Sequence, residues 1–580
     1  MENDIEKVRH SLSHIMAAAV NELFEKVKFG IGPAIENGFY YDFDLPHKFT
    51  LEDLPKIEER MKEIIKKNIT FNRKRVSKAK ARTLFKDQPY NREIIKELPG
   101  KTVYIYESGD FTDLCKGPHI KSTKEINPDG FKLTKIAGAY WKGDEKNQML
   151  QRIYGLAFGT KKELDDYMIR QEEAEKRDHR VLGKNLELFV FSDLVGKGLP
   201  LFTEKGSIIR RELERFIVDE EIKRGYKHVY TPDLARVELY KTSGHYPYYK
   251  DTMYPVMKID EEELILRPMT CPHHFQLYAS KQRSYRELPY RIAELAKQFR
   301  YEKSGELTGL IRVRAFCLAD AHIMVQKEEA VNEINNVLDL IDYIASVLGL
   351  KAGVDYRYRL SLGDRKDTKK YYKDDKAWDF AEEVLRNVLK KRKAPFFEAE
   401  KEAAFYGPKI DVQMKNFAGI ENTAFTVQYD FVMPKRFSLS YIDKDNTKKE
   451  PIVIHRSSIG AIERIIAFLI EYYAGRLPLW LSPVQVWLIP IGKNHWQYAR
   501  KIADELRQNK VRVEVKDERD TVSRKIRDGE IEKIPYLLVV GDKEVASEAV
   551  NVRTKNKTLG IIKTSDFIKQ ILEEIRTRKI

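Results

Sequence analysis

The sequence has little cysteine, no long apolar run, and no repeated or low-complexity segment. Its 580 residues include three cysteines, an odd and sparse set that gives no disulfide framework and favours a reducing cytoplasm. The longest apolar run, in IIAFLIEYYAG, is interrupted by Glu471 and is too short to span a membrane. The first residues, MENDIEKV, are acidic and lack the apolar core of a signal peptide. We therefore expect a cytoplasmic protein with no membrane segment.

Positive charge and ordinary hydrophobicity are what the composition offers instead. Lys and Arg outnumber Asp and Glu by 104 to 89, which gives a net charge of +15 at pH 7. A basic excess of this size favours a polyanionic partner, most often nucleic acid, although a generally basic proteome would also produce it. Apolar residues make up 42% of the chain, enough for several domains to bury a core each.

Changes in residue pattern divide the chain into four expected parts. Residues 1–160 open with apolar residues at helical spacing and continue into strands rich in glycine and aromatics. Residues 161–188 are dense in charge and predict an exposed linker helix. Residues 189–480 mix long helices with strands rich in Tyr and Val. Residues 481–580 alternate strand and helix, which predicts a small α/β domain with a largely parallel sheet.

Arg300 and Glu302 stand out in the stretch QFRYEKSGELTGLIRVRAF. On a strand, side chains two positions apart point to the same face. A guanidinium grips phosphate with two parallel hydrogen bonds, and a carboxylate beside it suits a donor such as an adenine amino group. For the pair taken alone, an ordinary ion pair on a surface hairpin is the simpler interpretation.

Arg464 lies within a strongly apolar helical pattern, HRSSIGAIERIIAFLIEYYAG. Burying an unpaired guanidinium is unfavourable, so this position requires an anionic partner. An ATP phosphate and a structural salt bridge satisfy that requirement about equally well.

Two pairs of metal-capable side chains share a spacing of four residues: His10 with His14, and Cys115 with His119. Helical spacing places the first pair on one face. The pairs indicate a zinc site, a catalytic site without metal, or a coincidence.

Six central stretches together resemble the threonyl-tRNA synthetase family of class II aminoacyl-tRNA synthetases: PMTCPHHFQLY, FRYEKSGELTGLIRVRAF, DAHIMV, AFYGPKIDV, TVQYDF and HRSSIGAIERIIAFL. HSLSHIMA, GPAIENGFYYDFDL, CKGPHI and AGAYWKGD resemble its editing domain, and IPYLLVVGDKEV its anticodon-binding domain. The resemblance covers essentially the whole chain. It implies an α+β multidomain fold: an α+β editing domain (1–160), a linker helix (161–188), a class II antiparallel-sheet catalytic domain (189–480) and an α/β anticodon-binding domain (481–580).

The resemblance implies that the chain joins threonine to its tRNA. ATP with Mg²⁺ would convert threonine to threonyl-adenylate, which is then transferred to tRNA(Thr). Arg300 matches the arginine on the α-phosphate, Glu302 the carboxylate facing adenine, and Arg464 the arginine on the ATP tail. Other active-site positions of the family match Asp320, Tyr406, Lys409, Gln428 and Arg312. A homodimer is implied as well.

Spacing alone predicts no metal site for Cys271, His322 and His455, which by default are a buried cysteine and two satisfied histidines. The resemblance implies that they hold one zinc ion per subunit. Three protein ligands leave coordination positions open, which in the family the amino and hydroxyl groups of threonine fill. Valine has no hydroxyl and would be rejected strongly.

Serine keeps the hydroxyl and lacks only a methyl group, which a pocket penalises by only about 1–3 kcal/mol. The resemblance assigns its removal to a second site, where His10, His14, Asp113, Cys115 and His119 would hydrolyse mischarged seryl-tRNA. A related domain of alanyl-tRNA synthetase resembles a metal-binding one. We favour a metal-free site here, with a zinc site as the alternative.

The chain departs from the family pattern in four respects. The small ubiquitin-like TGS domain that usually precedes the editing domain in bacterial members is expected to be absent. Leu318 stands where Gln is common, Ala319 where an acid is common, and Phe425 where a small residue is usual. These three positions are expected near the threonine pocket.

Two rival functions remain. A synthetase for proline or serine would share both arginines but would not need the three zinc-ligand candidates together with CKGPHI. A regulatory or RNA-binding paralogue would keep the fold without charging tRNA. Intact Arg300, Glu302 and Arg464 argue against this second rival.

Overall fold

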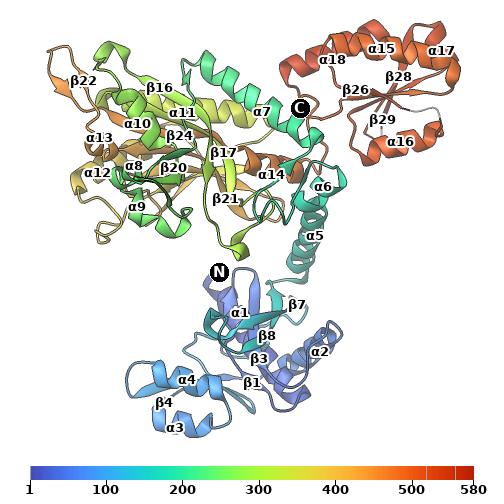
Figure 1. Ribbon diagram of the computed structural model, residues 1–580. Coiled ribbons are helices and arrows are strands. Elements are labelled where there is room, and N and C mark those ends of the chain that lie inside the picture. The colour runs from blue at the N-terminus through green and yellow to red at the C-terminus, as the bar shows by residue number, and fades with distance from the viewer. Residues whose placement is uncertain (1, 517–518, 556) are drawn as a thin grey trace. The chain divides into compact units, whose positions relative to one another are not determined.

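The computed structural model of the chain describes residues 2–516, 519–555 and 557–580. Its contacts divide it into two compact units, Met1–Glu172 and Glu173–Ile580 (Figure 1). The division falls inside the charged segment 161–188. Two helices occupy this segment rather than the single linker helix expected, α5 (Lys161–Arg177) and α6 (His179–Asn185). Asp178 starts the second helix because its side chain caps the backbone N–H of Arg180 at 2.7 Å.

The first unit is built on an antiparallel sheet in the order β1-β3-β8-β7, with β2 paired to β3. Apolar residues of α1 that recur at helical spacing, among them Leu12, Ile15 and Met16, are buried in its core with α2 and β3. The bounds are α1 Glu2–Leu23, β1 Lys28–Phe29, β2 Ala34–Ile35, β3 Gly38–Asp44, α2 Asp53–Lys66, β7 Phe131–Tyr140 and β8 Met149–Ala157.

A smaller antiparallel sheet, β4-β5-β6, belongs to the same unit. Two short helices close a separate core of Ala81, Phe85, Ile95, Val103 and Ile105 over it. The bounds are β4 Phe71–Ser77, α3 Lys78–Leu84, α4 Pro89–Glu97, β5 Thr102–Ser108 and β6 Phe111–Leu114.

The second unit contains an eight-stranded sheet in the order β11-β16-β17-β24-β21-β20-β18-β19. All neighbours are antiparallel except the two edge pairs, which are parallel. The antiparallel catalytic sheet expected from the sequence is therefore confirmed. The bounds are β11 Lys227–His228, β16 Tyr290–Phe299, β17 Ala315–Val325, β18 Tyr356–Ser361, β19 Phe396–Ala399, β20 Lys409–Lys415, β21 Glu421–Asp430 and β24 Ile452–Ala461.

Long helices cover one face of this sheet and leave the other for the site. α7 (Glu204–Lys223), α11 (Ala330–Val347), α12 (Asp375–Lys391) and α14 (Ile462–Tyr472) share one hydrophobic core with it (Figure 1). On the opposite face lies α10 (Cys271–Ala279). The shorter elements of this unit are α8 Val237–Ser243, α9 His245–Tyr248, α13 Met433–Arg436, β9 Phe189–Val190, β10 Leu201–Phe202, β12 Leu234–Arg236, β13 Met257–Ile259, β14 Glu262–Leu266, β15 Arg283–Ser284, β22 Tyr441–Ile442 and β23 Lys448–Lys449.

The last hundred residues form a five-stranded sheet, β26-β25-β27-β28-β29. β25, β26 and β27 are parallel, as expected, but β28 and β29 add antiparallel pairs, so the sheet is mixed rather than largely parallel. Most residues of β29 are exposed, which is why it lacked an apolar pattern. The bounds are β25 Val486–Pro490, α15 Trp496–Gln508, β26 Val513–Val515, α16 Val522–Ile531, β27 Tyr536–Val540, α17 Asp542–Ala546, β28 Ala549–Thr554, β29 Lys557–Lys563 and α18 Thr564–Thr577.

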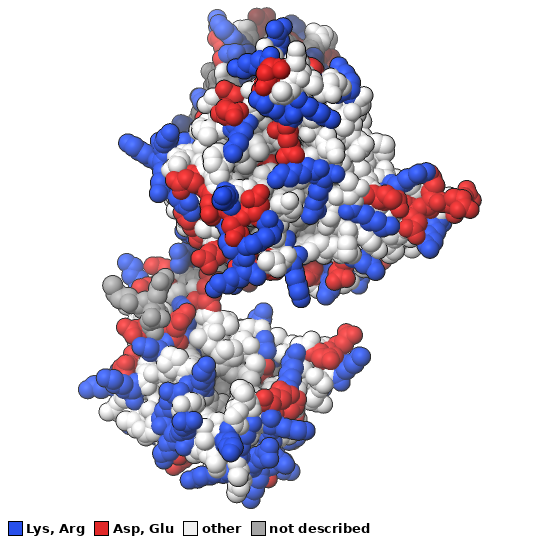
Figure 2. Space-filling model, turned by 90° about the vertical axis from the view of Figure 1, so that its left-hand side faces the viewer, with Lys and Arg blue, Asp and Glu red and all other residues white. Residues whose placement is uncertain are grey.

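Within the described part of the chain, every helix falls short of the length and apolar character needed to cross a bilayer. On the face shown in Figure 2, basic and acidic side chains are interleaved, so the positive excess there is not confined to one patch.

Candidate functional sites

Cys271, His322 and His455 meet on the open face of the eight-stranded sheet. His322 on β17 and His455 on β24 are direct partners in the antiparallel register, so both side chains project from the same face. Cys271 begins α10, which packs over them. One ligand atom from each lies within 4.8 Å of the other two, and all three residues are buried.

Asp430 fixes the tautomer of His455. Its Oδ2 atom lies 2.7 Å from His455 Nε2, and its Oδ1 atom accepts from the backbone N–H groups of Val432 and Met433. A carboxylate in this position accepts, so the ring donates from Nε2. The lone pair of His455 is therefore on Nδ1, where a metal can take it.

A chain of two hydrogen bonds, through Glu294 and His274, fixes the tautomer of His322. Burial would raise the pKa of Glu294, but hydrogen bonds from His274 and Thr231 and the charge of Arg267 hold that pKa at about 2. The ionised Glu294 therefore accepts from His274 Nε2 at 3.2 Å. His274 is left with a lone pair on Nδ1, which lies 2.8 Å from His322 Nδ1. His322 must donate there, so its own lone pair is on Nε2.

The donor set fits zinc. Two neutral imidazoles with oriented lone pairs and one thiol are ligands that zinc prefers, and three protein ligands leave a position open. Burial raises the pKa of Cys271 well above its usual value. A cation beside the sulfur is therefore needed to stabilise the thiolate.

An open cavity of about 580 Å³ extends from these ligands along the sheet. Residues that are register partners on neighbouring strands form two rows on the floor of this cavity. The first row is His322, His455, Gln428 and Lys409, and the second is Asp320, Ser457 and Thr426. Except for Arg464, the predicted site residues of the catalytic domain line this one cavity: Cys271, Arg300, Glu302, Arg312, Asp320, His322, Tyr406, Lys409, Gln428 and His455. Tyr406 stacks on His455 with ring centroids 4.9 Å apart and donates to Gln428.

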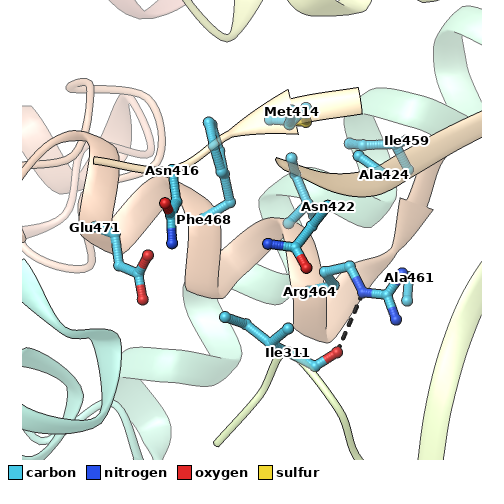
Figure 3. Close-up of a pocket in the computed structure, with 11 residues that line it drawn as sticks. Ile311, Met414, Asn416, Asn422, Ala424, Ile459, Ala461, Arg464, Phe468 and Glu471 are labelled. Atoms are coloured by element: carbon cyan, nitrogen blue, oxygen red, sulfur yellow. Dashed lines mark hydrogen bonds between the residues drawn. The ribbon is translucent and has the colours of Figure 1, made fainter. Parts of the chain in front are cut away.

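Arg464 lies in an adjoining pocket with Ile311 and Glu471 (Figure 3). It donates to the carbonyl oxygens of Ile311 at 3.1 Å and Thr423 at 2.8 Å. Carbonyls cannot neutralise a guanidinium, so these contacts do not provide the structural salt bridge considered for this residue. Burial lowers the pKa of Arg464, and the positive charges of Arg300 and Arg312 lower it further. This concentration of positive charge suits a polyphosphate.

The expectation that Arg300 and Glu302 share a strand face is wrong. β16 ends at Phe299, and both residues lie in the loop that follows. Glu302 instead accepts from Arg312 at 2.8 and 3.0 Å, while Arg300 donates to Gln298 at 3.4 Å. Both side chains nevertheless line the cavity.

The three departures from the family pattern do not share one location. Leu318 lines the cavity, on the same strand face as Asp320 and His322. Ala319 and Phe425 are buried in the hydrophobic core on the opposite face. Only Leu318 is therefore placed to alter contacts in the pocket, which corrects the expectation for the other two.

His245 lines the cavity and was not found from the sequence. Ser243 Oγ donates to the carbonyl of Tyr240 and so accepts from His245 Nδ1 at 2.7 Å. The lone pair is left on Nε2. Burial lowers the pKa of His245 to about 3, with the charges of His455, Arg436 and Arg300 adding to the effect. A neutral imidazole in a substrate cavity can accept a proton.

In the first unit, His10, His14, Cys115 and His119 form a second cluster, again with their ligand atoms within 4.8 Å of one another. The cysteine lies just after β6, and its sulfur is 3.3 Å from Nε2 of both His10 and His119. His14 Nδ1 lies 3.2 Å from Oδ2 of Asp113. The sequence pairs at spacing four are therefore not a coincidence of composition.

Burial sets the protonation of this cluster. It raises the pKa of Cys115 to about 12 and lowers the pKa of His119 to about 3. A raised thiol pKa disfavours thiolate attack, and the neutral imidazoles are available as proton acceptors. The same atoms also fit a metal, because two imidazole nitrogens face one sulfur.

Asp113 is held beneath this cluster. It accepts from Tyr41 at 2.5 Å and from the backbone N–H of Leu114 at 2.7 Å. Burial raises its pKa to about 6.

Three family profiles match the chain. The tRNA synthetase class II core domain (G, H, P, S and T) matches residues 254–473, the anticodon binding domain residues 485–574, and the threonyl and alanyl tRNA synthetase second additional domain residues 103–154. The threonine–tRNA ligase of Geobacillus sp. (strain WCH70) is 50% identical, covering 99% of this chain and 89% of the relative. That of Staphylococcus carnosus (strain TM300) is 48% identical, with the same two coverages.

Two solved structures of threonyl-tRNA synthetases are also similar to this chain. The RNA binding domain of threonyl-tRNA synthetase from Cryptosporidium parvum Iowa II superposes with a TM-score of 0.65 at 32% identity, covering 68% of this chain and 98% of that one. The putative threonyl-tRNA synthetase ThrRS-1 from Aeropyrum pernix gives a TM-score of 0.62 at 30% identity, covering 70% and 96%.

Proposed function

Because the chain belongs to the threonine–tRNA ligase family of class II aminoacyl-tRNA synthetases, we propose that it charges tRNA(Thr) with threonine and removes mischarged serine. A carboxylate oxygen of threonine attacks the α-phosphorus of ATP, the α–β anhydride bond breaks, and pyrophosphate leaves. A ribose hydroxyl of tRNA(Thr) then attacks the carbonyl carbon of the adenylate, and AMP leaves. The observation that carries this proposal is the convergence of Cys271, His322 and His455 on the cavity that also holds Arg300.

Phosphate binding falls to three arginines. Arg300 neutralises the α-phosphate, and Arg464 with Arg312 the remaining phosphates, together with Mg²⁺. The charges of Arg300 and Arg312, which lower the pKa of Arg464 further after burial, support this assignment. Glu302 accepts from Arg312 in the structure, so its binding of the adenine amino group requires it to share or exchange that partner. Lys409, which pairs with Asp411 at 3.0 Å, is held close to the cavity wall.

Threonine recognition falls to the zinc ligands and their neighbours. Zinc, when bound to Cys271, His322 and His455, supplies coordination positions for the amino and hydroxyl groups of threonine. Tyr406 and Gln428, joined by a hydrogen bond beside His455, restrict the room for the side chain, while Asp320 accepts from the amino group. One zinc ion per chain is proposed.

Hydrolysis of seryl-tRNA(Thr) falls to His10, His14, Asp113, Cys115 and His119. The neutral imidazoles take a proton from water as it attacks the ester carbonyl. The bond between the carbonyl carbon and the ribose oxygen then breaks, the imidazolium returns the proton to the ribose oxygen, and serine leaves. The Cys115 thiol positions the imidazoles rather than acting as a nucleophile, since burial keeps it protonated.

The remaining proposals concern assembly. The domain division is 1–160 for editing, 161–188 for the linker, 189–480 for catalysis and 481–580 for the anticodon, and the net charge of +15 supports contact with tRNA. Exposed apolar residues between β9 and β10, including Phe191 and the fully exposed Leu194, support a homodimer. A cytoplasmic location is proposed because the chain belongs to the threonine–tRNA ligase family.

The test is ATP–pyrophosphate exchange with threonine and zinc present, together with the zinc content of the purified protein. Threonine-dependent exchange and about one zinc ion per chain are expected. About two zinc ions would mean that the cluster of His10, His14, Cys115 and His119 also binds metal. If zinc-loaded protein shows no exchange, the chain is instead a regulatory or RNA-binding paralogue.

A further inference from the structure

His179 joins two separate parts of the catalytic site through one buried ring. It is the first residue of α6 and is 1% exposed. Its Nδ1 atom lies 2.7 Å from Oε1 of Glu471, and its Nε2 atom receives the backbone N–H of Leu310 at 3.1 Å. Neither the family motifs nor the reaction proposed above uses this residue.

The partners fix the direction of both bonds. A backbone N–H only donates, so Nε2 of His179 carries the lone pair. The ring proton is then on Nδ1 and is donated to Glu471. A single neutral imidazole therefore accepts from one element and donates to another.

Both elements carry the proposed ATP-binding arginines. Leu310 lies in the loop between β16 and β17, which bears Arg312, and it directly precedes Ile311, whose carbonyl accepts from Arg464 (Figure 3). Glu471 lies in the last turn of α14, the helix that carries Arg464. The ring of His179 therefore connects the loop to the helix through one hydrogen bond to each.

The loop fits tightly against the ring. Gly309 adopts φ +47°, and a Cβ atom at this position would lie 2.1 Å from His179 Nε2. Next to this joint, Arg177 donates to the carbonyl of Tyr472 at 3.3 Å and lies over the ring of Phe417 at 4.1 Å. The end of α5 and the start of α6 are therefore attached to the catalytic domain around Arg464.

We propose that His179 is a positioning residue for ATP, which holds the loop bearing Arg312 in register with the helix bearing Arg464. This inference rests on the proposed function. The important atom of His179 is Nε2, which accepts the hydrogen bond. Without this acceptor the buried N–H of Leu310 loses its partner, and the loop is expected to shift. A buried histidine that only fills space is the alternative.

Two substitutions separate these roles. His179→Gln retains a carbonyl oxygen near the position of Nε2 and can accept from Leu310. His179→Asn places its amide near Nδ1, where it can donate to Glu471 but does not reach Leu310. ATP–pyrophosphate exchange is measured for both, varying ATP and threonine separately, with melting temperatures recorded.

We expect the KM for ATP to rise about tenfold in His179→Asn and less than about threefold in His179→Gln, from the loss of one buried hydrogen bond. The KM for threonine should change less than twofold in both. Gly309→Ala should reproduce the effect of His179→Asn, because it displaces the same loop. Equal KM values for ATP in the Asn and Gln variants, or parallel increases for threonine, would overturn the inference. Absence of exchange in the unmodified protein would instead overturn the proposed function.

Discussion

The Nδ1 atoms of His274 and His322 lie 2.8 Å apart, so one of these nitrogens must carry the hydrogen that the other accepts. Glu294, by accepting from His274 Nε2, decides that His322 donates. The free nitrogen of His322, the proposed zinc ligand, is thereby set by a carboxylate that acts through His274 and does not itself belong to the proposed ligand set. Zinc affinity should depend on this remote group.

Glu294→Gln is expected to lower zinc affinity by about 10- to 100-fold. The amide can donate to His274, which would reverse the relay and place the hydrogen of His322 on its ligand nitrogen. Competition with a chromophoric chelator measures the affinity. Glu333→Gln, which alters a buried carboxylate paired with Arg291, serves as the matched control and should leave zinc affinity unchanged.

Arg464→Ala is expected to abolish threonine-dependent ATP–pyrophosphate exchange, because it removes a guanidinium whose partners in the protein are carbonyls rather than carboxylates. Loss of at least about 100-fold in kcat/KM for ATP is the expected scale. Arg476→Ala removes an arginine that pairs with Glu530 in the same unit, and it should retain exchange. Equal losses in the two variants would indicate general destabilisation.

Cys115→Ala should leave threonine activation unchanged and allow seryl-tRNA(Thr) to accumulate when serine is in excess. The thiol contacts both His10 and His119, so its removal frees two imidazoles that the hydrolysis requires in fixed positions. Acid-gel separation of charged tRNA, with labelled serine, measures the product. Clean threonyl-tRNA from this variant under serine challenge would refute the editing assignment.

His245→Ala is expected to slow transfer of threonine from the adenylate to tRNA by about 100-fold, since it removes a neutral imidazole whose Nε2 lone pair is available at the cavity wall, and to leave pyrophosphate exchange intact. Single-turnover transfer measures the effect.

The lowered pKa of His245, about 3, keeps the ring neutral throughout pH 6–8, so this group should give no inflection in the transfer rate there. Below about pH 6.5 the unfolded chain binds a proton that the folded chain does not. The contribution of this residue to stability is therefore present above pH 6.5 and is lost progressively as the pH falls towards 3. An unfolding free energy for His245→Ala that depends on pH as steeply as that of the unmodified protein would contradict this sign.

The sequence predicted elements whose signals are local. The helical spacing of Leu12, Ile15 and Met16 is a property of neighbouring turns, and α1 follows it. The position of Arg300 was misplaced because strand ends depend on pairing: β16 extends only as far as its register with β17, from Tyr290 to Phe299. β28 and β29 were not predicted. Most residues of β29 are exposed, so it carries no apolar run, whereas β28 is short and half-buried.

The residues that hold the proposed zinc ligands show what could not be predicted from the sequence. His274 follows His273 directly, and nothing in the chain distinguishes the one that reaches His322. Asp430 lies two positions after Gln428 on β21, so alternation places both on the site face, and this spacing is a signal that could have been used. Glu294 cannot be found in this way, because its role depends on three segments folding together.

The arginines that converge beside the cavity have a consequence for how the protein resists heat. Arg300 and Arg312 both disfavour the charged form of Arg464, so like charges are held close together by the rest of the fold. Part of the folding free energy is therefore used to keep repelling groups in place. An anion that binds among them relieves this repulsion, and the melting temperature should rise with nucleotide concentration as the dissociation constant requires. The catalytic domain is therefore expected to be most stable when nucleotide is bound.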